Sequence, residues 1–160
     1  MAQLIKDAAR DDAAKVLTEN WTGNSFPVDP VAIANTMGLK VFTAELPQNQ
    51  SGMIVKENNI AEIYLNRYQP RTRRSFTCAH EIGHYVDRQQ RNDNKYSFVD
   101  YRMGEQNVFE WYADHFAENL LMPEGEFKKQ LGAGRDVSRL SEYFGVSPAA
   151  VSTRLRHLKL

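Results

Sequence analysis

Cysteine is almost absent from the sequence, since Cys78 is the only one among 160 residues. One cysteine excludes an internal disulfide, so a hydrophobic core must stabilise the fold. Apolar runs long enough to cross a bilayer are also lacking. The first 17 residues carry too many charges for a secretory signal. These absences lead us to expect a cytoplasmic protein that has no membrane partner.

Low-complexity tracts and internal repeats are missing as well. Hydrophobic residues make up 42% of the chain and charged residues 25%, which is the balance of a globular domain rather than a disordered one. The net charge is zero, but segment 127–160 holds seven basic and two acidic residues, so it is +5 and the remainder is −5. This segment either contacts an acidic partner or presents a solvated helix face.

The spacing of apolar residues predicts two helices near the N-terminus and two long ones later in the chain. The first helix covers residues 2–20, and the second is short, with Asp29 as its N-cap and Gly38 at its end. The long helices cover residues 72–91 and 108–122. A further short helix and a basic helical segment follow, which together with the strands is typical of an α+β fold.

Alternating apolar and polar residues predict about three strands that are mostly antiparallel. One strand covers residues 39–46, and the segment 51–66 is typical of a hairpin with Asn58 and Asn59 in its turn. The segment 92–107 shows neither helical nor strand periodicity over a useful length, so we expect an irregular connection there.

The segment 72–91 contains the motif H-E-x-x-H at residues 80–84. Residues four apart lie on nearly the same face of a helix, so His80 and His84 can direct two imidazoles at one metal ion. Glu81 is displaced by about 100° around the axis, from where it can reach a water on the metal and take its proton. The pattern therefore predicts a hydrolytic zinc site with Glu81 as its base. The alternative is a surface helix with two solvated histidines.

A catalytic zinc site usually has three protein ligands and one open position, so a third ligand is needed. Asp87 and Gln90 occupy the places of the glycine and third histidine in the longer H-E-x-x-H-x-x-G-x-x-H motif, which excludes that subclass. Glu110 and Asp114 are four apart in the next long helix. Glu110 can complete the ligand set, and Asp114 can accept the other ring N–H of a ligating histidine. Alternatively, Asp87 is the third ligand, or Glu110 closes a capping box with Asn107.

Four further side chains of the two long helices bear on the predicted site. Cys78 lies two residues before His80, on another side of the helix, so we interpret it as a small buried residue rather than a ligand. A developing oxyanion needs a donor beside the metal. The candidates for that donor are Tyr85, Tyr112 and His115, and the sequence does not rank them.

These segments resemble a known family. "RRSFTCAHEIGHYV" followed by "FEWYADHFAENLLMP" is similar to the ImmA/IrrE family of bacterial and phage zinc metallopeptidases. "SGMIVKENNIAEIYLN" and "FPVDPVAIANTMGLKV" resemble the segments ahead of the motif in that family. The resemblance covers roughly residues 25–160. Cys78 departs from the family, in which an aliphatic residue is more frequent at this position.

The resemblance implies a zinc-dependent endopeptidase with one Zn²⁺ per chain. In this family the ligands correspond to His80, His84 and Glu110, a gluzincin-like set, and the base corresponds to Glu81. Its members cut or inactivate a partner repressor of the helix-turn-helix type, which releases genes of a mobile element or a stress response.

The resemblance also implies a small zincin-like domain whose sheet packs on the H-E-x-x-H helix. We expect this domain over residues 1–128 and a helix-turn-helix-like segment over 129–160. The strand 60–66 directly precedes the motif helix. If this strand is a sheet edge beside the metal, a substrate peptide can pair with it by strand addition. The alternative is an edge strand without such a partner.

The C-terminal segment 137–160 has the spacing of a helix-turn-helix, with Gly145 in the turn and Ser147 as the cap of the second helix. Its second helix carries the cations Arg154, Arg156 and Lys159, to which His157 can add. These cations can contact DNA phosphates. The segment can instead dock onto the repressor or support the protease domain. Two further functions therefore compete: a DNA-binding regulator with a structural or inactive metal site, and an antitoxin-like interaction module.

Overall fold

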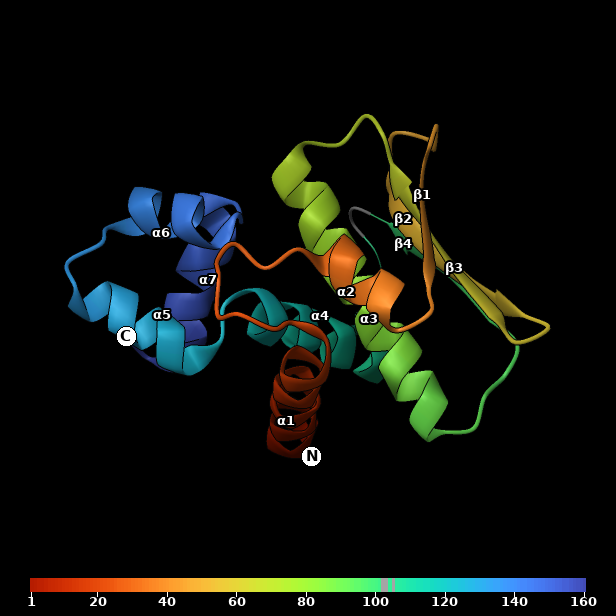
Figure 1. Ribbon diagram of the computed structural model, residues 1–160, viewed down its shortest axis with the longest axis horizontal. Coiled ribbons are helices and arrows are strands. Elements are labelled where there is room, and N and C mark those ends of the chain that lie inside the picture. The colour runs from red at the N-terminus through yellow and green to blue at the C-terminus, as the bar shows by residue number, and fades with distance from the viewer. Residues whose placement is uncertain (102–103, 105) are drawn as a thin grey trace.

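The chain forms seven helices and four strands within residues 1–101, 104 and 106–160, which the computed structural model describes (Figure 1). The helices are α1 (Ala2–Asn20), α2 (Pro30–Thr36), α3 (Arg71–Gln90), α4 (Val108–Leu121), α5 (Glu124–Gly132), α6 (Val137–Phe144) and α7 (Pro148–Leu158). The strands are β1 (Lys40–Ala44), β2 (Gln50–Glu57), β3 (Ile60–Asn66) and β4 (Tyr96–Tyr101). The predicted α+β class is confirmed. No helix in the described residues is both long and apolar enough to span a membrane.

The capping and turn residues predicted for α2 and for the β2–β3 hairpin lie at the ends of these elements. The Asp29 carboxylate accepts the backbone N–H of Val31 at 3.0 Å and caps α2. Gly38 follows the end of α2 with a φ of 84°, a value that favours glycine. Asn58 and Asn59 have φ values of 53° and 64° in the turn between β2 and β3. Asparagine tolerates this left-handed conformation, which a two-residue hairpin requires.

The sheet has the strand order β1-β3-β2-β4. Strand β2 pairs antiparallel with β3 and with β4, whereas β1 pairs parallel with β3. The prediction of about three strands is therefore wrong in their number, although most pairings are antiparallel as expected. A parallel pair forms because the chain crosses from one side of β3 to the other between β1 and β2. Local periodicity does not reveal such a crossover.

The fourth strand, β4, lies inside the segment 92–107 that we expected to be irregular. Phe98 stands opposite Ile54 of β2, and its ring stacks on His84 with the centroids 4.7 Å apart. The strand is short and mixes polar with aromatic residues, so its alternation is weak in the sequence. Its pairing with β2 and its contact with the motif helix stabilise it.

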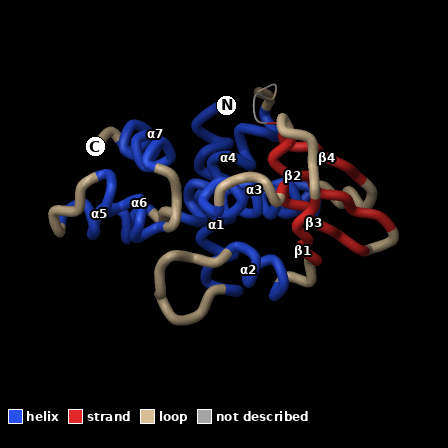
Figure 2. The backbone as a smooth tube through the Cα atoms, turned by 90° about the horizontal axis from the view of Figure 1, so that it is seen from above, coloured by secondary structure: helices blue, strands red, loops and turns tan. Residues whose placement is uncertain are grey.

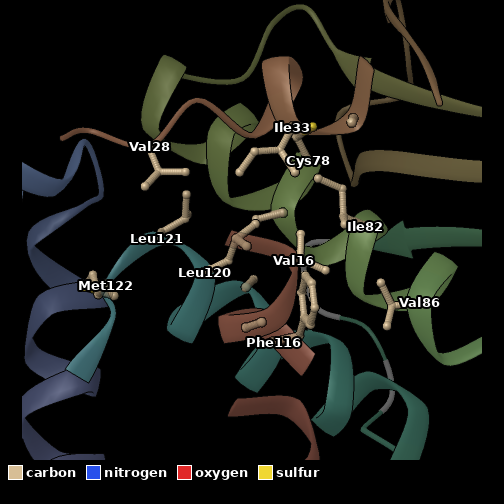
Figure 3. Packing of buried hydrophobic residues seen from close by; sticks show 14 of the residues in the cluster. Val16, Val28, Ile33, Cys78, Ile82, Val86, Phe116, Leu120, Leu121 and Met122 are labelled. Carbon is tan, nitrogen blue, oxygen red and sulfur yellow. The ribbon is translucent and has the colours of Figure 1, made fainter. Parts of the chain in front are cut away.

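Helix α3 lies between the sheet and α4, and α1 packs against α4 on the side away from the sheet (Figure 1). The core joins Val16 of α1, Ile82 of α3 and Phe116 of α4 (Figure 3). Cys78 is fully buried in the same cluster, which confirms it as a small core residue. The arrangement holds the motif helix against both the sheet and the helix that carries Glu110.

The helices α3 and α4 approach each other closely at Gly83. A Cβ atom added to Gly83 would lie 3.0 Å from Cα of Ala113 and 3.2 Å from Cβ of Phe116. Ala113 and Ala117 of α4 are fully buried, and their small side chains permit this close approach. We predict that Gly83→Val lowers the free energy of unfolding by about 1–3 kcal/mol through overpacking.

Urea denaturation in the presence of a chelator measures this loss without interference from a metal. Gly125→Val is the matched control, because a Cβ at that helical glycine meets no atom within 4 Å. An equal loss in the two variants would show that the contact between α3 and α4 is not tight.

The C-terminal helices α5–α7 lie on the other side of α1 and α4 from the sheet (Figure 2). Gly145 ends α6 with a φ of 65°, and the Ser147 hydroxyl accepts the backbone N–H of Ala150 at 3.1 Å to cap α7. The predicted turn is therefore confirmed. Phe144 and Val151 belong to the same hydrophobic cluster as the core of α3 and α4. The division of the chain at residue 128 stays a prediction.

Candidate metal centre

Three side chains from α3 and α4 converge on one point. The Nε2 atoms of His80 and His84 lie 3.1 Å apart, and each lies 3.1 Å from an oxygen of Glu110. Ligands at about 2.0–2.1 Å in a tetrahedron are separated by about 3.3 Å. The two histidines are buried and Glu110 is 22% exposed, so the group opens to solvent on the side of the carboxylate. Two imidazoles and a carboxylate at these distances fit a zinc ion with one position left open.

The start of α4 directs Glu110 toward the histidines. The Asn107 amide oxygen accepts the backbone N–H groups of Phe109 and Glu110 at 2.9 and 3.0 Å and so begins the helix. The carboxylate of Glu110 contacts the two imidazoles, so Asn107 caps the helix and Glu110 does not close a capping box with it. Asp87 lies elsewhere, since both of its oxygens accept a hydrogen bond from Nε of Arg91 at 3.1 Å.

Asp114 orients one of the two histidines. Its Oδ1 lies 2.8 Å from Nδ1 of His80, as the four-residue spacing from Glu110 predicted. With the Nδ1 proton donated to Asp114, the Nε2 lone pair of His80 points at the centre of the group. Burial opposes a charge on His80, but the hydrogen bonds to Asp114 and Glu110 raise its pKa well above the ordinary value. Burial lowers the pKa of His84.

Glu81 is fully buried, and neither of its oxygens has a hydrogen-bond partner among the described residues. Burial raises the pKa of this carboxyl well above its usual range. A buried, unpartnered carboxyl group costs stability, which favours a chemical role for it over a structural one. Glu81, His80 and Asp100 offer oxygen and nitrogen atoms within 4.8 Å of one another.

Asp100 was not predicted as a site residue. It lies near the end of β4, and burial raises the pKa of its carboxyl group. Its segment was expected to be irregular, so nothing in the sequence indicated that it faces His80. The position of Asp100 beside His80 could be predicted only if the segment 96–101 were recognised as a strand next to the motif helix.

A cleft of about 960 Å³ runs from this group toward the C-terminal helices. Its lining includes His80, Asp100 and Glu110 at one end and His115, Glu118 and His157 at the other. A cleft of this size accommodates several residues of a peptide.

The three candidates for an oxyanion donor now differ in position. Tyr112 donates its hydroxyl to Asp12 of α1 at 2.6 Å, which fixes it away from the cleft. Tyr85 lies under the ammonium group of Lys56, 5.5 Å from its ring centroid. His115 does line the cleft.

Strand 60–66 is not a sheet edge, which corrects the expectation that a substrate peptide pairs with it. Strand β3 pairs with β1 on one side and with β2 on the other. In the described residues the edge nearest the site is β4, whose Val99, Asp100 and Tyr101 line the cleft.

Arg154, one of the three cations proposed for DNA contact, faces the protein instead, and His157, which was expected to add to them, contacts a carboxylate. Arg154 is 3% exposed, donates to the Asn119 side chain at 3.0 Å and lies 3.5 Å from Glu118. His157 lies 2.8 Å from Glu118. The sequence did not show this because their partners are more than thirty positions away. Arg156 and Lys159 remain exposed.

The fold is similar to that of a solved structure. A chain described as "Mycobacterium tuberculosis transcriptional regulator" superposes with a TM-score of 0.68 at 17% identity, over 96% of this chain and 51% of that one. This chain therefore spans about half the length of the regulator, and at that identity the likeness shows the fold alone. The comparison with curated proteins found no match.

The comparison with family models gives a more specific result. The Peptidase M78 model, described as the IrrE N-terminal-like domain, matches residues 34–156. The match spans most of the chain and includes α3 and α4, the two helices that carry the converging side chains. The chain therefore belongs to the Peptidase M78 family of IrrE N-terminal-like domains, as its resemblance to the ImmA/IrrE metallopeptidases predicted.

Proposed function

We propose that the protein is a zinc-dependent endopeptidase that cleaves a helix-turn-helix repressor and thereby releases genes of a mobile element or a stress response. The observation that supports it most is the convergence of His80, His84 and Glu110 at 3.1 Å beside the unpartnered carboxyl group of Glu81. Membership of a peptidase family supports the reaction class. The repressor as substrate rests on the resemblance to the family.

Each residue of the site has a separate role in the proposed reaction. His80, His84 and Glu110 would hold the zinc ion, which when bound supplies a Lewis acid and lowers the pKa of water. Asp114 holds the His80 ring in the tautomer whose Nε2 is free to ligate. Glu81 takes a proton from the attacking water at a carboxylate oxygen and returns it to the departing amine of the cleaved peptide bond. Burial raises the pKa of Glu81, which favours uptake of the proton from water.

Strand β4 is the proposed place where the substrate binds. It pairs with β2 on one side, and its residues Val99, Asp100 and Tyr101 line the cleft. A substrate segment in extended conformation would add to this edge and place its scissile bond near His80 and Glu110. This proposal replaces the one that assigned the contact to strand 60–66.

Cleavage of a repressor encoded beside the gene of this protein tests the function. We expect that the zinc-loaded protein cuts the repressor at one or a few bonds, that a chelator stops the reaction and that added zinc restores it. Mass spectrometry of the products identifies the scissile bond. A stable complex without cleavage, with zinc present and the repressor folded, would favour the antitoxin-like interaction module.

The DNA-binding alternative has less support. Arg154 is buried and paired with Glu118, so fewer cations of α7 are available to phosphates, and His157 contacts the same carboxylate. A DNA-binding protein would show affinity for duplex DNA that falls steeply with salt. The structural neighbour's description as a transcriptional regulator applies to a chain about twice as long.

A further inference from the structure

A second group of metal-ligating side chains lies at the other end of the cleft. Oε2 of Glu118 is 2.8 Å from Nδ1 of His157 and 3.7 Å from Nδ1 of His115. The two imidazole rings have their centroids 5.0 Å apart, and the three residues offer ligand atoms within 4.8 Å of one another. Two of the residues come from α4 and one from α7, so the group joins the C-terminal helix to the helix of Glu110.

The environment of Glu118 favours a cation at this place. The residue is 5% exposed, and its Oε1 is buried without a hydrogen bond among the described residues. Arg154 lies on the side of Oε1, with Nη1 3.5 Å away, which leaves Oε2 to the two imidazoles. Burial lowers the pKa of His115, which favours the neutral form of the ring that binds metal.

The donor set is the same as that of the first site, two imidazoles and one carboxylate. The two atom separations of 2.8 and 3.7 Å lie on either side of the about 3.3 Å expected between tetrahedral zinc ligands. Imidazole and carboxylate ligands suit Zn²⁺, Co²⁺ and Ni²⁺ rather than Ca²⁺ or Mg²⁺. His115 and Glu118 are three apart on one helix turn, so they need no rearrangement of the backbone to share an ion.

We propose that His115, Glu118 and His157 form a second transition-metal site, which takes Zn²⁺ and ties α7 to α4. This ion is additional to the single zinc per chain that the resemblance implied, and the proposal does not depend on peptidase activity. The second site is the weaker of the two, because the guanidinium of Arg154 repels the cation there, whereas Asp114 adds a negative charge at the first site.

Zinc titration of the metal-free full chain against a chromophoric chelator tests the proposal, with zinc as the only added ligand. We expect two ions per wild-type chain with different affinities, and a single ion, the tight one, in His157→Ala. Arg156→Ala is the matched control on the neighbouring position of α7 and keeps two. His115→Gln, which keeps a polar side chain of similar size beside Glu118, serves as a second variant and is also expected to bind one.

Thermal unfolding tests the second site without measuring the number of bound ions. Zinc in excess of one equivalent should raise the Tm of wild type by more than it raises the Tm of His157→Ala, because only wild type has a second site that binds the ion in the folded state. The proposal is overturned if wild type and both histidine variants bind the same number of ions. It is equally overturned if the second equivalent binds wild type without any change in Tm.

Discussion

Replacing Glu81 by glutamine is expected to slow repressor cleavage by about 10²–10⁴-fold, the usual contribution of a general base. The zinc content should stay at the wild-type level, because Glu81 lies outside the group formed by His80, His84 and Glu110. The free energy of unfolding should stay the same or increase, since the carboxyl group of Glu81 is buried without a partner and glutamine carries no charge. Cleavage rates, zinc analysis and urea denaturation measure the three quantities.

Glu142→Gln is the matched control, because Glu142 is exposed on α6 and is not among the residues that line the cleft. It should leave the cleavage rate within about twofold of wild type. Full activity in Glu81→Gln would show that another group moves the proton, and Asp100 would be the first to examine because it lies beside His80 and Glu81.

Replacing Glu110 by alanine is expected to reduce zinc affinity at the first site by more than about 100-fold. The change removes one of three ligands and leaves the buried imidazoles of His80 and His84 without their shared partner. Asp114→Asn should reduce the zinc affinity less, by about 10–100-fold, because Asp114 holds the His80 ring in place without contacting the ion. Competition with a chromophoric chelator measures both affinities.

The order of these effects distinguishes Glu110 from the other acid that the sequence offered. Asp87→Asn should leave zinc affinity unchanged, because both Asp87 oxygens are bonded to Arg91. A larger loss in Asp87→Asn than in Glu110→Ala would assign the third ligand to Asp87 and refute the geometry described for α4.

Helical periodicity was sufficient to bring most of the site together from the sequence. His80 and His84 share a helix face by their spacing, and the same argument joins Glu110 to Asp114. The small residues Ala113 and Ala117 suit a close approach of the two helices, which the structure has at Gly83. Each of these inferences uses contacts within one helix or between two adjacent ones, and local patterns describe such contacts well.

Local periodicity does not predict contacts between segments that are far apart in the sequence. Strand β4 depends on its pairing with β2, so the position of Asp100 could not be derived from its own short segment. The cation Arg154 seemed suited to phosphate contact, but its charge is neutralised by Glu118, which another helix provides. For the same reason the grouping of His115 with His157 did not follow from the sequence.

The zinc-loaded crystal structure, with anomalous scattering recorded at the zinc edge, tests the central claim most directly. The account predicts an anomalous peak at about 2.0–2.2 Å from Nε2 of His80, Nε2 of His84 and a carboxylate oxygen of Glu110. Absence of a peak at this position, or a peak there with the carboxylate of Glu110 turned away, would contradict it.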